Sequence, residues 1–122
     1  MWNSGTEENP VKAEYDPCPD GWRVPTYAEL DELNNNYSSW TTDDNGQSGR
    51  WFSGPNSYTP TVPQVFFPAA GSLYDLTGDA DHRDDAGYYW SSRPDGNDAY
   101  HLMFGGGAYL ISNGRANGFS VR

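Results

Sequence analysis

The last third of the chain alternates short β-prone runs with turns rich in glycine and asparagine, and this alternation constrains the fold most. The β-prone runs are residues 87–92, 99–104, 108–112 and 118–122. The turns between them contain Asp95-Gly96-Asn97, Gly105-Gly106-Gly107 and Asn113-Gly114. Connections this short cannot make a parallel crossover, so the runs are expected to pair as antiparallel strands.

One helix is predicted, near the start of the chain. Residues 16–25 hold three prolines, which exclude a helix because proline lacks the amide hydrogen and restricts the residue before it. Thr26 and Glu29 follow with the spacing of a capping box, in which each side chain binds the backbone amide of the other residue. Asn34-Asn35-Asn36 is expected to end this helix.

The middle of the chain is predicted to be mostly loop. Residues 38–64 are rich in small polar residues and proline, and we expect a long ordered loop held by aromatic side chains, with a short strand near residues 51–52. Residues 65–74 predict a buried strand with a proline kink, and residues 75–86 an acidic loop. The expected fold class is therefore α+β, with antiparallel sheets and one main N-terminal helix, in a single domain over residues 1–122.

Composition excludes several classes of partner. The chain carries a formal net charge of −10, which repels phosphate backbones and anionic lipid, so neither nucleic acid nor the membrane surface is an expected partner. No apolar run reaches the length of a membrane span, so direct membrane insertion is not expected. Mean hydropathy is only −0.85, but an aromatic share of 16% favours a folded core over a disordered chain.

Several ordered motifs resemble one protein family. Residues 16–26, DPCPDGWRVPT, resemble the "DPCPxGWRxPT" opening of a large Bacteroidetes paralogous domain, also called the Fibrobacter succinogenes major paralogous domain. Further segments of the chain resemble the segment that precedes this motif in the family and the motifs that follow it, in the same order: residues 2–6, 67–71, 87–92, 99–100 and 115–122. The resemblance implies a C-type-lectin-like fold, related to that of formylglycine-generating enzymes. It also implies an extracellular setting, on surface lipoproteins, pilus-like adhesins or phage receptor-binding proteins.

The resemblance carries one further implication and one departure. Some similar proteins are variable proteins of diversity-generating retroelements, in which residues of the last strands are randomised to change the ligand. In the family, a cysteine usually follows the block equivalent to residues 118–122 and can lie beside the equivalent of Cys18. Here the sequence stops at Arg122, so we expect a domain excised from a longer chain. Whether Cys18 forms a disulfide in the intact protein is left open.

No catalytic residue is assigned. Cys18 is the single cysteine, it lies between two prolines, and no histidine is close in sequence to activate it, so a structural thiol is expected. Formylglycine-generating enzymes use paired cysteines, which this chain lacks. An acid pair of the kind that hydrolyses glycosides depends on spatial pairing, and the sequence leaves it open.

No cofactor is expected, with calcium as the alternative. Carboxylates alternate in one loop and could bind Ca²⁺ through oxygen: Asp79, Asp81, Asp84 and Asp85. Their spacing is not that of an EF-hand, and the sugar-binding triplets of calcium-dependent lectins are absent from the sequence. A solvated acidic loop is the simpler interpretation.

Strand periodicity predicts one ligand-binding face. Tyr100, Leu102 and Phe104 share a face that we assign to the core, together with Ala108 and Leu110 of the next run. The opposite face and its adjoining turn supply the candidate contacts, with an apolar centre and a polar rim. The candidate ligand-binding residues are Trp90, Arg93, Asp95, Asp98, His101, Met103, Gly105, Tyr109, Ile111 and Asn113.

These expectations combine into a non-enzymatic ligand-binding or display module. It would belong to a bacterial cell-surface or virion protein, such as an adhesin or a receptor-binding domain, and bind a protein or glycan through the outer face of its last strands. A region around Trp22, Trp90 and Phe119 would form its rigid scaffold. The alternative is a structural or assembly domain whose outer face packs on a neighbouring domain.

Overall fold

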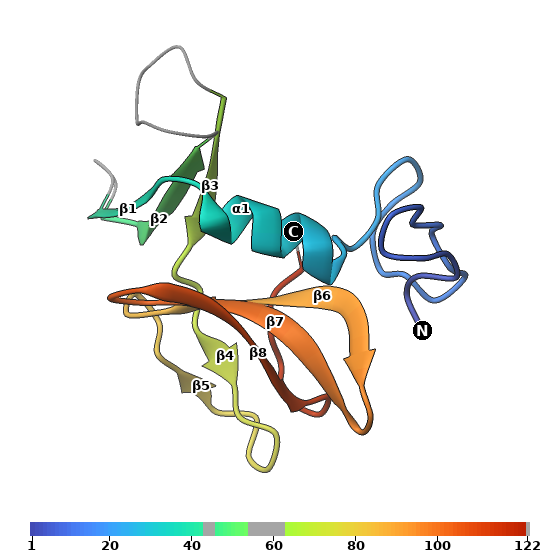
Figure 1. The fold of residues 1–122 in the computed structure, drawn as a ribbon. Coiled ribbons are helices and arrows are strands. Elements are labelled where there is room, and N and C mark those ends of the chain that lie inside the picture. Colours follow the sequence, from blue (N-terminus) through green and yellow to red (C-terminus); the bar gives the residue numbers. More distant parts are fainter. Residues whose placement is uncertain (43–45, 54–62, 122) are drawn as a thin grey trace.

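A computed structural model describes residues 1–42, 46–53 and 63–121 as an α+β domain (Figure 1). The elements, in chain order, are α1 (Tyr27–Asn35), β1 (Ser38–Thr42), β2 (Ser48–Ser53), β3 (Gln64–Pro68), β4 (Ser72–Leu73), β5 (Ala80–Asp81), β6 (Gly87–Asp95), β7 (Asp98–Phe104) and β8 (Ala108–Gly114). They form the antiparallel sheets β1-β2-β3, β4-β5 and β6-β7-β8. The predicted fold class is confirmed at this level.

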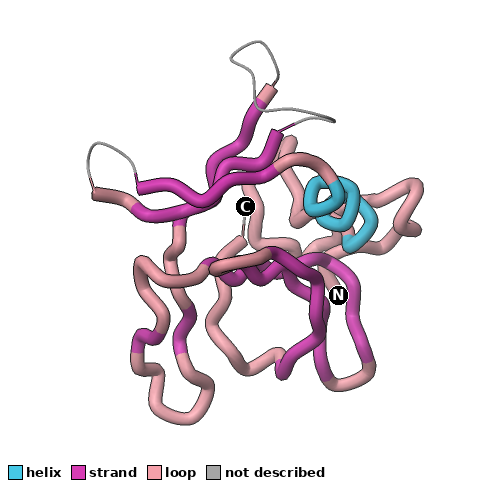
Figure 2. The backbone as a smooth tube through the Cα atoms, turned by 60° about the vertical axis from the view of Figure 1, so that its left-hand side comes forward, coloured by secondary structure: helices cyan, strands magenta, loops and turns pink. Residues whose placement is uncertain are grey.

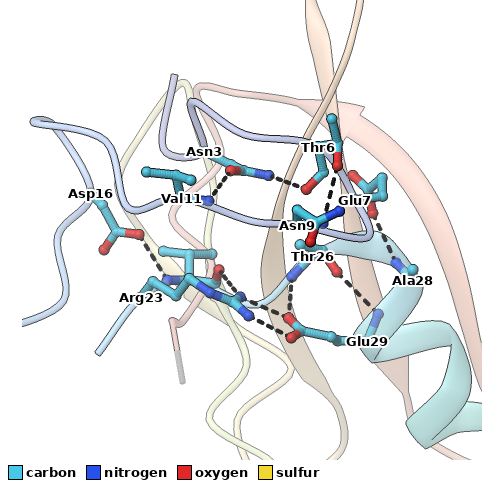
Figure 3. A network of polar contacts seen from close by, with 11 residues as sticks. Asn3, Thr6, Glu7, Asn9, Val11, Asp16, Arg23, Thr26, Ala28 and Glu29 are labelled. Atoms are coloured by element: carbon cyan, nitrogen blue, oxygen red, sulfur yellow. Dashed lines mark hydrogen bonds and ion pairs between the residues drawn. The ribbon is translucent and has the colours of Figure 1, made fainter. Parts of the chain in front are cut away.

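The capping box predicted at the start of α1 is present. The Thr26 hydroxyl accepts a hydrogen bond from the Glu29 amide (3.2 Å), and the Glu29 carboxylate accepts one from the Thr26 amide (2.8 Å). The same carboxylate binds both terminal nitrogens of Arg23, at 2.6 and 2.8 Å (Figure 3). The helix ends where the Asn36 amide binds the Leu33 carbonyl. Short-range chemistry thus fixes both ends of α1.

An aromatic core joins α1 to the two larger sheets. Helix α1 lies across one face of the β6-β7-β8 sheet, and the β1-β2-β3 sheet lies beside the helix (Figures 1 and 2). The buried side chains between these elements are Leu30, Phe52, Phe67, Ala69, Tyr89, Leu102 and Phe104. Three of the rings meet Phe104 edge-on or stacked, at centroid distances of 5.9 to 6.5 Å. This core holds one face of β6-β7-β8 and leaves the other outside.

The buried strand predicted over residues 65–74 is instead two strands, β3 and β4, in different sheets, and its end is exposed at Leu73. The loop predicted over residues 75–86 contains β5.

Two further predicted segments also differ from the structure. The expected loop over residues 38–64 contains β1 and β2, which pair with each other and with β3; its residues 43–45 and 54–62 lie outside the described residues. Residues 118–121 do not form a strand of the sheet and make only single bridges, to Leu73 and Tyr89. Pairing with segments that are distant in the sequence decides both outcomes, and the polarity of the local sequence does not predict such pairing.

Candidate functional site

The outer face of the β6-β7-β8 sheet carries two rows of side chains. The register pairs Tyr88 with Met103 and Met103 with Tyr109 in one row. It pairs Trp90 with His101 and His101 with Ile111 in the next. Because side chains alternate along a strand, these six share the face opposite Leu102 and Phe104. The predicted division into an inner and an outer set is therefore correct for β7 and β8.

The C-terminal segment covers part of this outer face. Ser120 runs beside β6, where its amide binds the Tyr88 carbonyl and its carbonyl accepts from the Trp90 amide. This places the Phe119 ring 4.5 Å from Trp90, 4.6 Å from His101 and 5.0 Å from Tyr88, centroid to centroid. The β6 side of the face is thus a second, smaller aromatic cluster.

The prediction that His101 and Trp90 are exposed contact residues is therefore wrong. His101 is 1% exposed and Trp90 is 6% exposed, because Phe119 closes over them. Both belong to the packing that holds the C-terminal segment on the sheet. Trp90 and Phe119, predicted to form one scaffold with Trp22, do pack together, but Trp22 is 73% exposed.

What remains open on this face is an apolar patch, which we call the β7–β8 patch: Met103, Tyr109 and Ile111. Tyr109 is 49% exposed and Ile111 is 47% exposed, whereas Met103 is half-buried between the rows. Asn113 continues the exposed side of β8. Burial, with the charge of Asp81 and Tyr109 nearby, raises the pKa of Tyr88 at the covered edge of the patch.

The predicted polar rim does not surround this patch. The Arg93 guanidinium lies over the rings of Tyr27 and Tyr100, at 5.0 and 5.3 Å, on the side of the sheet that faces α1. Gly105 contributes a carbonyl to Arg50 (3.4 Å) in the turn before β8. Asp95 and Asp98 form the end pair of the β6–β7 hairpin. The predicted rim residues, Arg93, Asp95 and Asp98, thus lie at the β6–β7 hairpin, and Gly105, predicted to face outward, lies in the turn after β7.

A pocket at the end of the β6–β7 hairpin was not predicted. It has a volume of about 630 Å³, and its walls come from the N-terminus, β6, β7 and the C-terminal segment. Its side chains include Trp2, Trp90, Ser92, Arg93, Pro94 and Arg115. We call it the hairpin pocket. The pattern of the sequence places Trp2 and Arg115 at opposite ends of the chain, and only the fold brings them together.

A larger, shallower hollow of about 930 Å³ lies beside Cys18 and the exposed Trp22. Burial, reinforced by the carboxylate of Asp16, raises the pKa of the Cys18 thiol. The thiol is therefore held in its protonated form, which is the less reactive one. This agrees with the structural role expected for Cys18.

The acidic loop does not gather its carboxylates into a metal site in the part of the chain that the structure describes. No three of its histidine or acidic side chains lie together in a metal-binding arrangement there. Asp81 instead binds the backbone amide of His82 (2.9 Å), and its second oxygen lies 3.3 Å from the imidazole. Asp79, Asp84 and Asp85 are exposed.

His101 gives a prediction about pH. Burial lowers the pKa of His101 to about 4, against the opposing effect of a hydrogen bond with the Ala99 backbone, and its Nδ1 has no partner among the described residues. Between pH 6.5 and 4 the unfolded chain binds a proton at His101 that the folded chain does not. The free energy of unfolding therefore decreases as the pH is lowered through this range. We expect a loss of at most about 3 kcal/mol.

The variant His101→Leu should remove this part of the pH dependence, as measured by urea unfolding at pH 7, 5.5 and 4.5. His82→Leu is the matched control, because His82 is exposed and its loss should leave the dependence in place. An unchanged slope in His101→Leu would contradict the assignment.

The helix found among the described residues, α1, is too short to cross a membrane.

Comparison of the chain with family models, with characterised proteins and with solved structures gave no match.

Proposed function

We propose that this chain is a non-enzymatic ligand-binding module with a C-type-lectin-like fold, displayed on a bacterial cell surface or a virion. Its ligand is a protein or a glycan, and the β7–β8 patch makes the central contacts. One observation carries the proposal: the chain covers the β6 side of its own outer sheet face with Phe119 and leaves Tyr109 and Ile111 open beside it.

Two physical arguments support this use of the patch. Exposed apolar side chains grouped on one face of an acidic, polar domain are typical of contact surfaces. Tyrosine and methionine are enriched at such surfaces because they bring large contact area with little charge to desolvate. The patch also lies on a rigid base, since its strands carry Leu102, Phe104 and Leu110 on the opposite face, packed into the core.

The test uses arrays of purified glycans and of purified surface proteins, probed with the fluorescently labelled domain. The double variant Tyr109→Ser/Ile111→Ser should lose at least tenfold in signal on every spot that the parent binds. The double variant Tyr74→Ser/Leu76→Ser is the matched control, because these residues are also exposed, at 51% and 79%, and lie outside the patch. Signal that survives the patch variant, or falls equally in both variants, would overturn the proposal.

A further inference from the structure

We infer that the hairpin pocket binds a carboxylate-bearing sugar of the uronic-acid class. This site goes beyond the proposed use of the β7–β8 patch, because it consists of other residues and takes a small ligand. The inference depends on three features of the pocket: its unpaired cations, the fixed geometry of those cations, and a wall that holds the partly exposed indole of Trp2 and the buried hydroxyl of Ser92.

The pocket concentrates positive charge in an acidic protein. Lys12 forms an ion pair with Asp16, and Arg23 forms one with Glu29. Within residues 1–42, 46–53 and 63–121, the arginines that form no ion pair with a carboxylate are Arg50, Arg83, Arg93 and Arg115, and of these Arg93 and Arg115 line the hairpin pocket. With a net charge of −10, carboxylates are abundant in the chain. Two guanidinium groups without one, in the same pocket, favour an anionic ligand.

Both guanidinium groups are held in place without using all their donors. Arg115 donates its Nε to the Asp98 carbonyl (2.8 Å) and its Nη2 to the Gly96 carbonyl (2.6 Å), which uses two of its five N–H groups. Arg93 is positioned by the rings of Tyr27 and Tyr100. Stacked or anchored guanidinium planes of this kind suit bidentate binding of a carboxylate.

The remaining walls suit a sugar ring. Trp2 and Trp90 line the pocket. Trp2 is only partly buried, so its indole face can pack against the C–H face of a pyranose, whereas Trp90, 6% exposed and packed on Phe119, belongs to the buried wall. The Ser92 hydroxyl, also in the wall, is buried and finds no hydrogen-bond partner among the described residues, so it is available to a ligand hydroxyl. A volume of about 630 Å³ is ample for one or two sugar units.

The test is an NMR titration of the whole chain with glucuronic acid, followed through the indole N–H signals of Trp2 and Trp90. These signals are assigned with Trp2→Phe and Trp90→Phe. We expect saturable shifts of both signals with glucuronic acid and none with glucose at the same concentrations. Arg93→Gln should weaken binding at least tenfold, whereas Arg83→Gln, an exposed arginine outside the pocket, should leave it unchanged.

Three results would overturn the inference: no saturable shift of either indole, equal binding of glucose, or equal weakening by Arg83→Gln. Equal affinity for acetate would overturn the sugar part, since the carboxylate alone would then account for binding. Tyr109→Ser/Ile111→Ser should not change the titration. Failure of the pocket and failure of the β7–β8 patch are therefore distinguishable.

Discussion

Replacement of Asp16 by alanine is expected to lower the free energy of unfolding by about 3 kcal/mol or more. The Asp16 carboxylate is fully buried and accepts hydrogen bonds from the amides of Cys18 and Val24, each at 2.8 Å, and from the Lys12 ammonium at 3.0 Å. Alanine would leave the amides of Cys18 and Val24 without their acceptor and would remove the ion-pair partner of Lys12, which keeps only the Cys18 carbonyl. Unsatisfied donors of this kind are costly when buried.

The pH dependence of this contribution has a definite sign. Burial alone would raise the pKa of Asp16, but the hydrogen bonds from Val24, Cys18 and Lys12 outweigh it and hold the pKa below its ordinary value of 3.8. The stabilisation is therefore present above that value and is lost as pH falls through the lowered pKa. The stabilisation by Asp16 should therefore disappear at a lower pH than the stabilisation that depends on neutral His101.

Urea unfolding at pH 7, followed by tryptophan fluorescence, measures the loss. Asp20→Ala is the matched control, because Asp20 is exposed in the same proline-rich segment; it should change stability by no more than about 0.5 kcal/mol. If Asp16→Ala costs no more than Asp20→Ala, the carboxylate does not hold this segment in place.

Local chemistry made the helix and the hairpins predictable. Thr26 and Glu29 lie one helical turn apart, so their capping pattern can be recognised without knowing the rest of the fold. The turn residues between β6, β7 and β8 likewise fix where each strand ends. Periodicity then correctly assigned Leu102 and Phe104 to the core and Tyr109 and Ile111 to the surface.

The covering of the outer face could not be predicted in the same way. Alternation along β7 says that His101 and Leu102 face opposite sides, but it does not say whether another segment covers either side. Phe119 buries His101 through a tertiary contact. The hairpin pocket escaped prediction for the same reason, since Trp2 and Arg115 meet only in the folded chain. The near absence of lysine was a usable signal that arginine holds fixed positions here.

Phe104→Ala should destabilise the domain by about 3 to 5 kcal/mol, the usual cost of truncating a fully buried phenylalanine. Its ring contacts Phe52 and Phe67 of the β1-β2-β3 sheet and Tyr89 of β6, so it joins the two larger sheets. Tyr109→Ala, a truncation of similar size on the exposed side of β8, is the control and should cost less than about 1 kcal/mol.

Gly87 allows a sharper test of this packing. It lies directly opposite Phe104 in the β6–β7 register, and a Cβ at Gly87 would overlap the Phe104 ring. Gly87→Ala should therefore cost about 1 to 3 kcal/mol in the parent chain by overpacking. In the Phe104→Ala background the ring is gone, so the same substitution should cost much less. A double-mutant cycle by urea unfolding measures this coupling, and strictly additive losses would show that the two residues do not meet.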